Sequence, residues 1–426
     1  MLHTQTRAQT LAQKLIAKAC GRDAVAVGDI VTCEVDLAMF HDSSGPRRLK
    51  PMLDELGAQI WDTSKIVLVI DHYVPEADDE SRRIVRIARD WAKQQALPHV
   101  YDSVGICHVV LPERGHLRPG MFCVGGDSHS PTGGAFGAYM FGIGSTEMLG
   151  VVVSGQIWVK VPETLRMRWH ARLARGVTAK DMMLHMIGRF GMNGARYQAV
   201  EFCGEAVAAL SMQERMTLSN ISAEMGAQAG LIAPDAVTLD YLRSAGVTHE
   251  IDVARWQSDA DAAAETHEFD AAALAPQVAA PHSPANTDDV QAFGNVEVQL
   301  AYVGACTGAK LDDLRAAATV LKGRKVARGV RLVVAPASLR DQEAATREGV
   351  MAILEAAGAQ VLATSCGACS GYGGQIPEGS TVISTTARNF KGRMGAETAQ
   401  VYLGSPYTVA ASALRGHITD PREVLA

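Results

Sequence analysis

Short apolar runs alternate with helix-like segments along this 426-residue chain, and this alternation constrains the fold more than any other feature. Runs this short predict buried strands rather than helices. Strands are predicted at 66–70, 121–124, 298–303, 330–334, 360–363 and 381–384. Helices are predicted over 311–322 and 341–357, the second with Val350, Ile353, Leu354 and Ala357 on one stripe. The alternation predicts an α/β fold with mainly parallel sheets flanked by helices.

The length corresponds to about three domains of roughly 150 residues each. Two shifts in composition indicate where they divide. Residues 160–180 carry six basic residues after an apolar block, and 258–290 is rich in Ala, Asp, Pro and His, which is typical of a linker. We therefore expect domains near 1–162, 163–290 and 291–426.

Charge and hydropathy exclude several classes of protein. The chain has 40 basic and 46 acidic residues, and this net charge of −6 argues against a protein that coats nucleic-acid phosphates. The N-terminus lacks the apolar region of a signal peptide. The weakly charged stretch 130–159 contains Glu147 and many small residues, which favours buried core over a membrane span. We expect a cytoplasmic protein without disulfides and without membrane or nucleic-acid partners.

Reactive side chains follow five predicted strands at the point where each strand ends. These side chains are Asp71-His72, Asp127-Ser128-His129, Cys306, Cys366 and Arg388. In open α/β sheets, ligands bind beyond the carboxyl ends of the strands. The pattern therefore predicts one site assembled from all five loops.

Cys366 and Cys369 form a C-x-x-C turn, which suits a redox pair, half of a zinc site or part of an iron–sulfur ligand set. The helix of a thioredoxin-like unit does not follow the turn, and the sequence has no second C-x-x-C or H-x3-H to complete a zinc site. Cys306 offers a third thiolate. Three cysteines can hold a four-iron cluster and leave one iron open as a Lewis acid. Buried free thiols are the alternative.

Carboxylates stand beside imidazoles at Asp71-His72 and at Asp127-x-His129. A carboxylate fixes the tautomer of a histidine and supports its charged form. His108 also follows an apolar stretch. Taken singly, each histidine is typical of a packed core residue, but together, near the cysteines, they favour acid–base chemistry.

A pair of residues and two loops add to this set. Glu224 lies four residues after Asn220, so both share a face if the segment is helical. The glycine-rich loop 125–134 suits either an anion cradle or a tight turn, and it fits neither common phosphate motif. Arg388 and Arg393 lie five residues apart in a loop. Arginine forks bind carboxylates in bidentate fashion, which suits a di- or tricarboxylic acid, although a solvated basic loop has the same composition.

Together these residues resemble the aconitase superfamily and, more narrowly, the isopropylmalate dehydratase large-subunit family. The resemblance runs from TLAQKLIAKA at 10–19 to GHITDPRE at 416–423. Its most specific pieces are GDSHSPTGGAFGAYMFGIGSTE at 126–147, RNFKGRMG at 388–395 and the three cysteines.

The resemblance implies a three-domain large subunit that carries a [4Fe–4S] cluster on Cys306, Cys366 and Cys369. His72, paired with Asp71, matches the family's proton donor to the leaving hydroxyl. His108, Asp127, His129 and Glu224 match the network around the iron-bound water, and Asn220 matches a residue that hydrogen-bonds near the cluster. The implied substrate contacts are Arg388, Arg393, Ser44 and, in the glycine-rich loop, Ser128.

The chain departs from the family pattern in three places. Gly308 replaces an Asn after Cys306, Ala387 replaces an Asn before Arg388, and Cys-Gly-Ala-Cys replaces Cys-Gly-Pro-Cys. The first two changes remove amides near the cluster, which is expected to alter its potential and stability.

Single-chain aconitases carry a fourth, swivelling domain that supplies a serine base, whereas this sequence ends at Ala426. The resemblance therefore implies a small-subunit partner that provides both, and an inactive chain without it.

The implied function is that of the large subunit of an iron–sulfur hydro-lyase. It would dehydrate or isomerise a substituted malate, first of all 3-isopropylmalate in leucine biosynthesis. Homoaconitate, 2-methylmalate and 2,3-dimethylmalate are the rival substrates. Two other classes compete: an iron-sensing nucleic-acid binder, which the acidic balance disfavours, and a structural or electron-relay cluster, for which the sequence offers no obvious fourth thiol.

Overall fold

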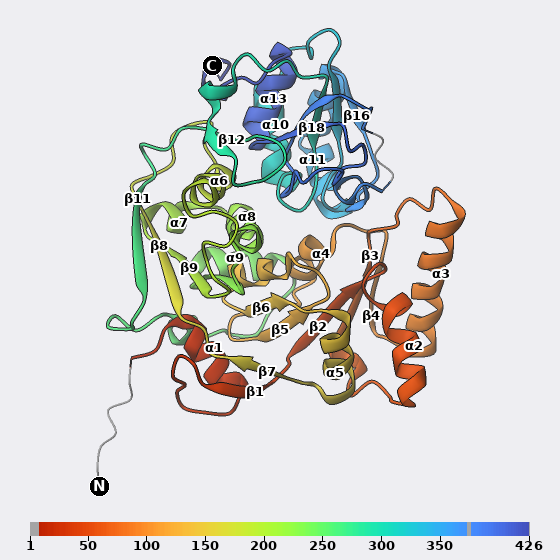
Figure 1. Cartoon of the computed structure of the whole chain (residues 1–426), viewed down its shortest axis with the longest axis vertical. Helices are drawn as coiled ribbons and strands as arrows, with labels where there is room; N and C mark the ends of the chain where they lie inside the picture. Colours follow the sequence, from red (N-terminus) through yellow and green to blue (C-terminus); the bar gives the residue numbers. More distant parts are fainter. Residues whose placement is uncertain (1–7, 373–375, 426) are drawn as a thin grey trace.

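Three mainly parallel sheets and one antiparallel ribbon organise residues 8–372 and 376–425, the part of the chain that this computed structural model describes (Figure 1). The predicted α/β class is confirmed. All six predicted strands form, with ends displaced by at most two residues.

The first sheet is fully parallel, in the order β4-β3-β2-β5-β6. Its strands are β2 (Leu37–His41), β3 (Ile66–Ile70), β4 (His99–Asp102), β5 (Phe122–Gly125) and β6 (Tyr139–Gly142). Its helices are α1 (Leu11–Ala19), α2 (Pro46–Leu56), α3 (Asp79–Gln94), α4 (Cys107–Glu113) and α5 (Ser145–Ser154), with the 3-10 turn η2 (Ser130–Phe136). Every residue of β2 and β3 is buried, as expected for central strands of a parallel sheet covered on both faces.

A two-stranded antiparallel ribbon, β1 (Ile30–Glu34) and β7 (Gln156–Lys160), flanks this sheet. The second sheet is also parallel, in the order β10-β9-β8-β11. It contains β8 (Thr164–His170), β9 (Ala199–Cys203), β10 (Ala229–Ile232) and β11 (Glu265–Asp270). Its helices are α6 (Ala179–Phe190), α7 (Glu205–Ala209), α8 (Met212–Ile221) and α9 (Ala236–Ser244), with the 3-10 turn η3 (Ser222–Met225).

The third sheet has seven strands in the order β13-β12-β18-β17-β14-β15-β16. These are β12 (Gln277–Ala279), β13 (Thr287–Asp289), β14 (Leu300–Val303), β15 (Arg331–Val334), β16 (Ala359–Val361), β17 (Thr381–Ser384) and β18 (Gln400–Leu403). β12 pairs antiparallel with both β13 and β18, and the other described strand pairs of this sheet are parallel. The helices are α10 (Leu311–Leu321), α11 (Leu339–Arg347), α12 (Val350–Ala357) and α13 (Pro406–Arg415), with the 3-10 turn η6 (Gly367–Ser370).

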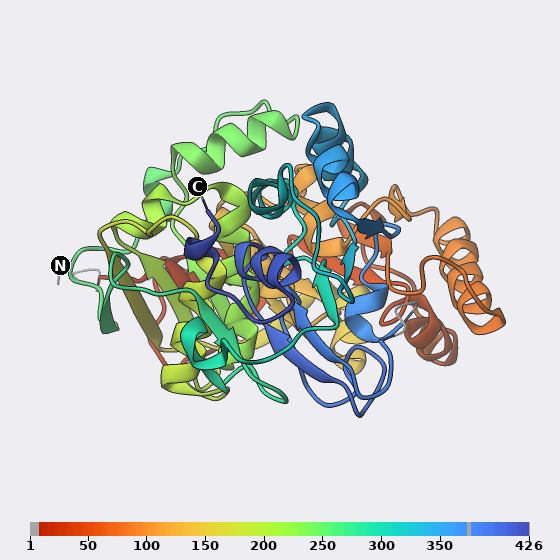
Figure 2. The same cartoon turned by 90° about the horizontal axis from the view of Figure 1, so that it is seen from above.

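One apolar cluster joins the first and third sheets, since Val67 and Cys123 of the first share it with Ala301 and Val303 of the third. The second sheet has a separate cluster centred on residues such as Met167. Figures 1 and 2 agree that α2 and α3 lie at one end of the molecule and β8 and β11 at the other. The loop after β3 of the first sheet meets the loop after β16 of the third sheet, because the Cys366 amide donates to the Asp71 carbonyl.

Two predictions of local structure were wrong. The single helix over 341–357 is two helices, α11 and α12, because Gly349 adopts φ +74° between them and starts a new helix direction. The segment 258–290, predicted to be a linker, contains β11, β12 and β13. Its polar composition reflects exposed strand faces rather than missing structure.

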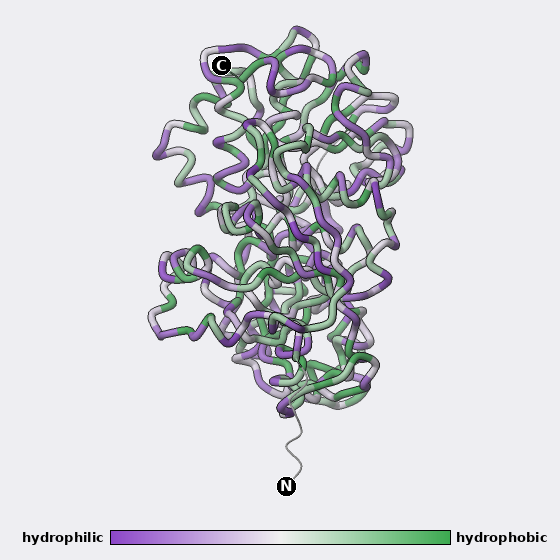
Figure 3. The backbone as a smooth tube through the Cα atoms, turned by 90° about the vertical axis from the view of Figure 1, so that its left-hand side faces the viewer, coloured by the Kyte–Doolittle hydropathy of each residue, from purple (hydrophilic) through white to green (hydrophobic). Residues whose placement is uncertain are grey.

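Among the described residues, no helix is both long and apolar enough to cross a membrane. Figure 3 shows hydrophobic and hydrophilic stretches interleaved along the whole backbone. The weakly charged stretch 130–159 divides into η2, β6, α5 and most of β7. The predicted buried core holds for η2 and most of β6, whereas α5 and β7 lie largely at the surface.

Candidate active site

Asp71 and His72 directly follow the buried strand β3. The His72 Nδ1–H donates to Asp71 Oδ1 at 2.7 Å, and the other Asp71 oxygen accepts from the Cys107 amide at 2.7 Å. Burial alone would lower the pKa of His72, but the Asp71 carboxylate outweighs it and raises that pKa to about 9. The same pairing holds the pKa of Asp71 below its usual value against the effect of burial. The pairing with Asp71 therefore favours the charged imidazolium form of His72, which can donate a proton.

His41 and Asp42, which sequence reasoning missed, support this pair from the end of β2. The Asp42 carboxylate accepts from the backbone amides of His72 at 3.0 Å and Tyr73 at 2.8 Å, which fixes the loop after β3. The His41 ring stacks on the His72 ring with centroids 3.7 Å apart. The signal was present in the sequence, because an apolar run at 37–40 ends in His-Asp just as the run at 66–70 ends in Asp-His.

Asp127, just past β5, is the centre of a second network. Its Oδ1 lies 2.7 Å from His108 Nε2 and accepts from the His129 amide at 2.8 Å. Its Oδ2 lies 3.6 Å from His41 Nε2, which links this network to His72. Burial opposes ionisation, but His108, His129 and His41 keep the pKa of Asp127 well below its usual value. Asp127 is therefore a carboxylate that orients three imidazoles.

Glu224 extends this network to the arginine loop. Its Oε1 lies 3.0 Å from His129 Nε2 and accepts from Arg388 Nε at 2.6 Å. Burial favours the neutral acid, but His129 and Arg388 lower the pKa of Glu224. Burial also opposes the charge on His129, and Asp127 and Glu224 overcome it to raise the His129 pKa. Glu224 lies in η3, beyond the end of α8, so its approach to the site does not come from sharing a regular helix with Asn220.

Cys306 follows β14 and contacts Asn220. The Asn220 side chain donates to Cys306 Sγ at 3.2 Å and to Thr132 Oγ1 at 2.8 Å. Burial and the charge of Cys369 raise the pKa of Cys306 to about 12. Among the described residues, Asn220 Oδ1 is buried without a hydrogen-bond partner.

Cys366 and Cys369 lie in the loop that contains η6. Their thiols hydrogen-bond each other, and this bond, with the charge of Arg393, lowers the pKa of Cys369. The Cys366 amide donates to the Asp71 carbonyl at 2.9 Å, which joins this loop to the loop after β3. Within the described part of the chain, Arg393 Nε has no hydrogen-bond acceptor although it is buried.

The two predicted serines lie on the side of Asp127. Ser44 touches Gly126, where a Cβ atom would lie 2.7 Å from Ser44 Oγ. Ser128 is exposed and lines, with Asp127 and Arg388, a cavity of about 370 Å³. This cavity is the mouth of the site on the side of the second sheet.

Two buried lysines lie behind the cysteine loops, and no sequence signal marked them. Lys180 donates to the carbonyls of Thr385 at 2.6 Å and Thr386 at 2.7 Å, and burial lowers its pKa to about 7. Lys310 donates to the Cys306 carbonyl at 3.1 Å and to Asp313 Oδ2 at 2.7 Å. Lys180 fixes the backbone just before Arg388, and Lys310 fixes the backbone at Cys306.

The structure shows what surrounds Gly308 and Ala387, the two positions where the family pattern has an Asn. A Cβ at Gly308 would lie 2.1 Å from Thr385 Cβ, so the packing of Thr385 leaves no room for a side chain there. Ala387 is 3% exposed and packs into the apolar cluster of the second sheet. In this chain, the positions expected to carry amides are therefore filled by close backbone and apolar contacts.

The predicted residues thus form one connected set. Asp71 and His72 join the cysteine loop through the Cys366 amide, and Asp127 joins the arginine loop through His129 and Glu224. The donor set combines three thiols, a buried amide N–H on one sulfur and a guanidinium beside another. That chemistry fits a thiolate-ligated iron–sulfur cluster, which is stabilised by hydrogen bonds and positive charge near its sulfurs. The imidazole–carboxylate groups around it can move protons.

Known proteins resemble the chain over nearly its whole length. Residues 13–295 and 287–416 match the Aconitase family (aconitate hydratase). The 3-isopropylmalate dehydratase large subunit 1 of Methanopyrus kandleri is 43% identical over 98% of this chain and 100% of its own length. The probable methanogen homoaconitase large subunit of Methanosarcina mazei is 43% identical over 92% of this chain and 99% of its own length.

The structure of aconitase X (holo-form) from Thermococcus kodakaraensis aligns with a TM-score of 0.49 and 13% identity over 84% of each chain. The match to the family over most of the sequence, and the relatives aligned nearly end to end, decide the question: this chain is a member of the aconitase family.

Proposed function

We propose that the chain is the large subunit of a [4Fe–4S]-dependent hydro-lyase that dehydrates and isomerises a substituted malate. The first choice of substrate is 3-isopropylmalate, because that is the substrate in the name of the relative from M. kandleri. Homoaconitate follows from the name of the relative from M. mazei, and 2-methylmalate and 2,3-dimethylmalate remain rivals.

One observation carries this proposal: the Asp71–His72 pair is tied to the C-x-x-C loop. Asp71 holds His72 by its side chain at 2.7 Å and accepts the Cys366 amide by its carbonyl at 2.9 Å. A proton donor fixed beside a cysteine ligand loop is what protonation of a departing hydroxyl at that loop requires. Neither a redox pair nor a structural zinc clip needs such a donor.

Cys306, Cys366 and Cys369 are the proposed cluster ligands, and Asn220 donates to the first of them. When bound, such a cluster supplies a Lewis-acidic iron with an open coordination position. His108, Asp127, His129 and Glu224 are proposed to orient the water beside it. This assignment is supported by their unbroken chain of hydrogen bonds.

Arg388 and Arg393 are proposed to hold the substrate carboxylates, with Ser44 and Ser128 as further contacts. The buried Arg393 Nε, which has no acceptor among the described residues, is free to bind a carboxylate oxygen. Glu224 orients the Arg388 guanidinium from behind by accepting from its Nε. His72 then protonates the leaving hydroxyl, while a base on the partner removes the proton from the neighbouring carbon.

That base is proposed to be a serine of a small subunit, which also provides the swivelling domain. The words "large subunit" in the names of both relatives support a separate partner.

We also propose that the three sheets correspond to domains near 1–162, 163–290 and 291–426. Strands β12 and β13 precede residue 291 but pair into the third sheet. Residues 1–7, 373–375 and 426 fall within these limits but outside the described residues.

The test is an anaerobic assay of the cluster-loaded chain with and without the aconitase-family small subunit encoded in the same genome. 3-Isopropylmalate, homoaconitate, 2-methylmalate and 2,3-dimethylmalate are offered separately, and the unsaturated acid is followed by its ultraviolet absorbance. We expect turnover of one substrate by the pair and none by the chain alone. Dehydration by the chain alone refutes the role of the partner, and no turnover of any of the four by the pair refutes the proposed reaction.

A further inference from the structure

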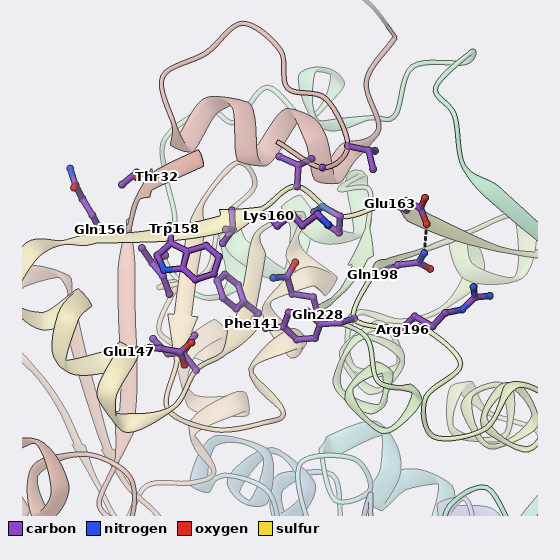
Figure 4. A pocket seen from close by; sticks show the side chains of 18 of the residues that line it. Thr32, Phe141, Glu147, Gln156, Trp158, Lys160, Glu163, Arg196, Gln198 and Gln228 are labelled. Carbon is purple, nitrogen blue, oxygen red and sulfur yellow. Dashed lines mark hydrogen bonds between the residues drawn. The ribbon is translucent and has the colours of Figure 1, made fainter. Parts of the chain in front are cut away.

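A groove of about 950 Å³ runs beside the β1–β7 ribbon, outside the network of site residues (Figure 4). Figure 4 shows Trp158 and Lys160 on β7, with Phe141 and Gln228 on the wall below them. The turn at 196–198 closes one end, where Gln198 hydrogen-bonds Glu163. Nothing in the proposed reaction uses this groove.

The outer face of the ribbon carries two large exposed apolar side chains, Ile30 and Trp158, among polar ones. Trp158 pairs with Thr32, and Lys160 pairs with Ile30, so all four side chains share one face of the ribbon. Trp158 is 67% exposed and Ile30 is 69% exposed. Large apolar side chains gathered on a surface and rimmed by polar groups mark interaction sites.

Tyr197 adds a third exposed aromatic or aliphatic group, and its backbone is held in an uncommon conformation. Arg196 and Tyr197 have φ of +46° and +60°, in the left-handed region that residues with side chains rarely adopt. The Tyr197 amide donates to the Gly226 carbonyl at 2.8 Å, which secures the turn, and its side chain is 62% exposed. Gly226 follows η3, so the turn that presents Tyr197 is tied to the segment that carries Glu224. Such strain persists where the surroundings enforce it, commonly at functional surfaces.

The groove is continuous with the mouth of the site. Ile143, Tyr197 and Gln228 line both the groove and the cavity that contains Asp127 and Arg388. A protein bound in the groove therefore lies beside that mouth. The proposed small subunit is the partner that must reach this mouth with its base, which makes it the occupant that the geometry favours over a second copy of this chain.

We propose that Ile30, Trp158 and Tyr197, with Lys160 and Arg196 at the rim, form the docking surface for the small subunit. We call these five residues the Trp158 surface. The partner presents aliphatic or aromatic side chains to the groove and polar side chains to the rim. This inference rests on the proposed function for the identity of the partner, and it adds which face of this chain the partner binds.

The test measures binding of the purified small subunit encoded in the same genome to the cluster-loaded chain by anaerobic calorimetry. Trp158→Glu and Tyr197→Glu are each expected to raise Kd at least tenfold, because aromatic side chains dominate the affinity of interfaces. Leu56→Glu on α2 is the matched control, since Leu56 is 62% exposed but lies outside the groove. Its Kd is expected to equal that of the wild type. Iron content and visible spectra that match the wild type establish that each variant is folded and loaded.

Binding of both Trp158→Glu and Tyr197→Glu within about twofold of the wild type overturns the proposal, as does failure of the wild-type chain to bind. Self-association of the chain that Trp158→Glu abolishes, without effect on small-subunit binding, assigns the surface to a second copy and also overturns it.

The outcome is separable from that of the proposed reaction. A wild-type pair that dehydrates a substituted malate while the variants bind normally refutes the surface alone. A wild-type pair that binds through Trp158 but turns over none of the four substrates refutes the reaction alone.

Discussion

Asp71 serves two loops at once, because its carboxylate binds His72 Nδ1 at 2.7 Å while its carbonyl accepts the Cys366 amide at 2.9 Å. The proton donor and the C-x-x-C loop are therefore positioned by one fully buried residue. This connection crosses between the first and third sheets. A shift of either sheet would move the imidazolium relative to the thiols.

Replacing His72 tests the proton donor. We expect His72→Ala to lower kcat by about 10²–10⁴-fold, the usual contribution of a positioned acid, with the cluster spectrum intact. Steady-state kinetics of the reconstituted pair, with iron analysis of the same samples, measure this. Full activity of His72→Ala removes His72 from the reaction.

Asp71→Asn tests how His72 is charged. The Asp71 carboxylate raises the pKa of His72 to about 9, and this pKa should fall when an amide replaces it. A group with a raised pKa is protonated below that value, so activity that depends on the imidazolium is retained at lower pH and lost as pH rises. We expect the alkaline limb of the pH–rate profile to move to lower pH in Asp71→Asn. An unchanged limb would assign it to another group.

Asn220 tests the environment of the cluster. Hydrogen bonds to cluster sulfurs influence reduction potential, so loss of the Asn220 contact to Cys306 Sγ is expected to lower the potential and speed the loss of iron in air. Asn220→Ala is compared with the exposed control Asn295→Ala by EPR-monitored redox titration. Equal potentials in the two variants would show that this contact does not tune the cluster.

A substitution at Gly308 tests how closely Thr385 packs against this position, where the family pattern has an Asn. Gly308→Ala places a methyl group 2.1 Å from Thr385 Cβ and is expected to cost about 1–3 kcal/mol of unfolding free energy. Gly150→Ala in α5 is the matched control, because its Cβ meets nothing within 4 Å and alanine favours a helix interior by about 0.5–1 kcal/mol. Urea midpoints should shift in opposite directions for the two variants. A neutral Gly308→Ala would mean that the loop after Cys306 yields easily.

Glu113 is a buried acid between the first and third sheets, and its ionisation is expected to make the free energy of unfolding depend on pH. Its Oε1 accepts from Ser338 Oγ at 2.6 Å, and burial with the nearby Asp341 raises its pKa to about 8. The folded state therefore favours the protonated acid, and the resulting stability is present below about pH 4.5 and is lost as pH rises to about 8. The loss is up to about 1.4 kcal/mol per pH unit.

Glu113→Gln keeps the acceptor for Ser338 and cannot ionise. We expect it to match the wild type at pH 5 and to have a higher urea midpoint at pH 8. The exposed Glu343→Gln should follow the wild type at both values. A wild-type advantage over Glu113→Gln at pH 8 would contradict the assigned direction.

The sequence correctly predicted the position of a reactive side chain where that side chain follows an apolar strand, as at Asp71-His72 after β3 and Cys306 after β14. It failed at His41 and Asp42 because the strand before them was not predicted, although all five residues of β2 are buried. It also failed at Gly349, where the apolar stripe continues across a break that depends on a left-handed backbone angle.

The remaining features depend on tertiary packing that no local pattern records. Lys180 reaches the site from α6, more than 200 positions before its Thr386 acceptor. The reason for Gly308 lies in a contact with Thr385 on another strand end. The continuity of the groove with the mouth at Tyr197 likewise requires two sheets to be in place.

The central claim is most directly tested by the metal content of the anaerobically purified chain. We expect about four irons and four acid-labile sulfides per chain, with an oxidation-labile iron whose loss produces a three-iron EPR signal. Zinc in place of iron, or no metal after careful reconstitution, would contradict the account, because Cys306, Cys366 and Cys369 would then not hold an open-cornered cluster.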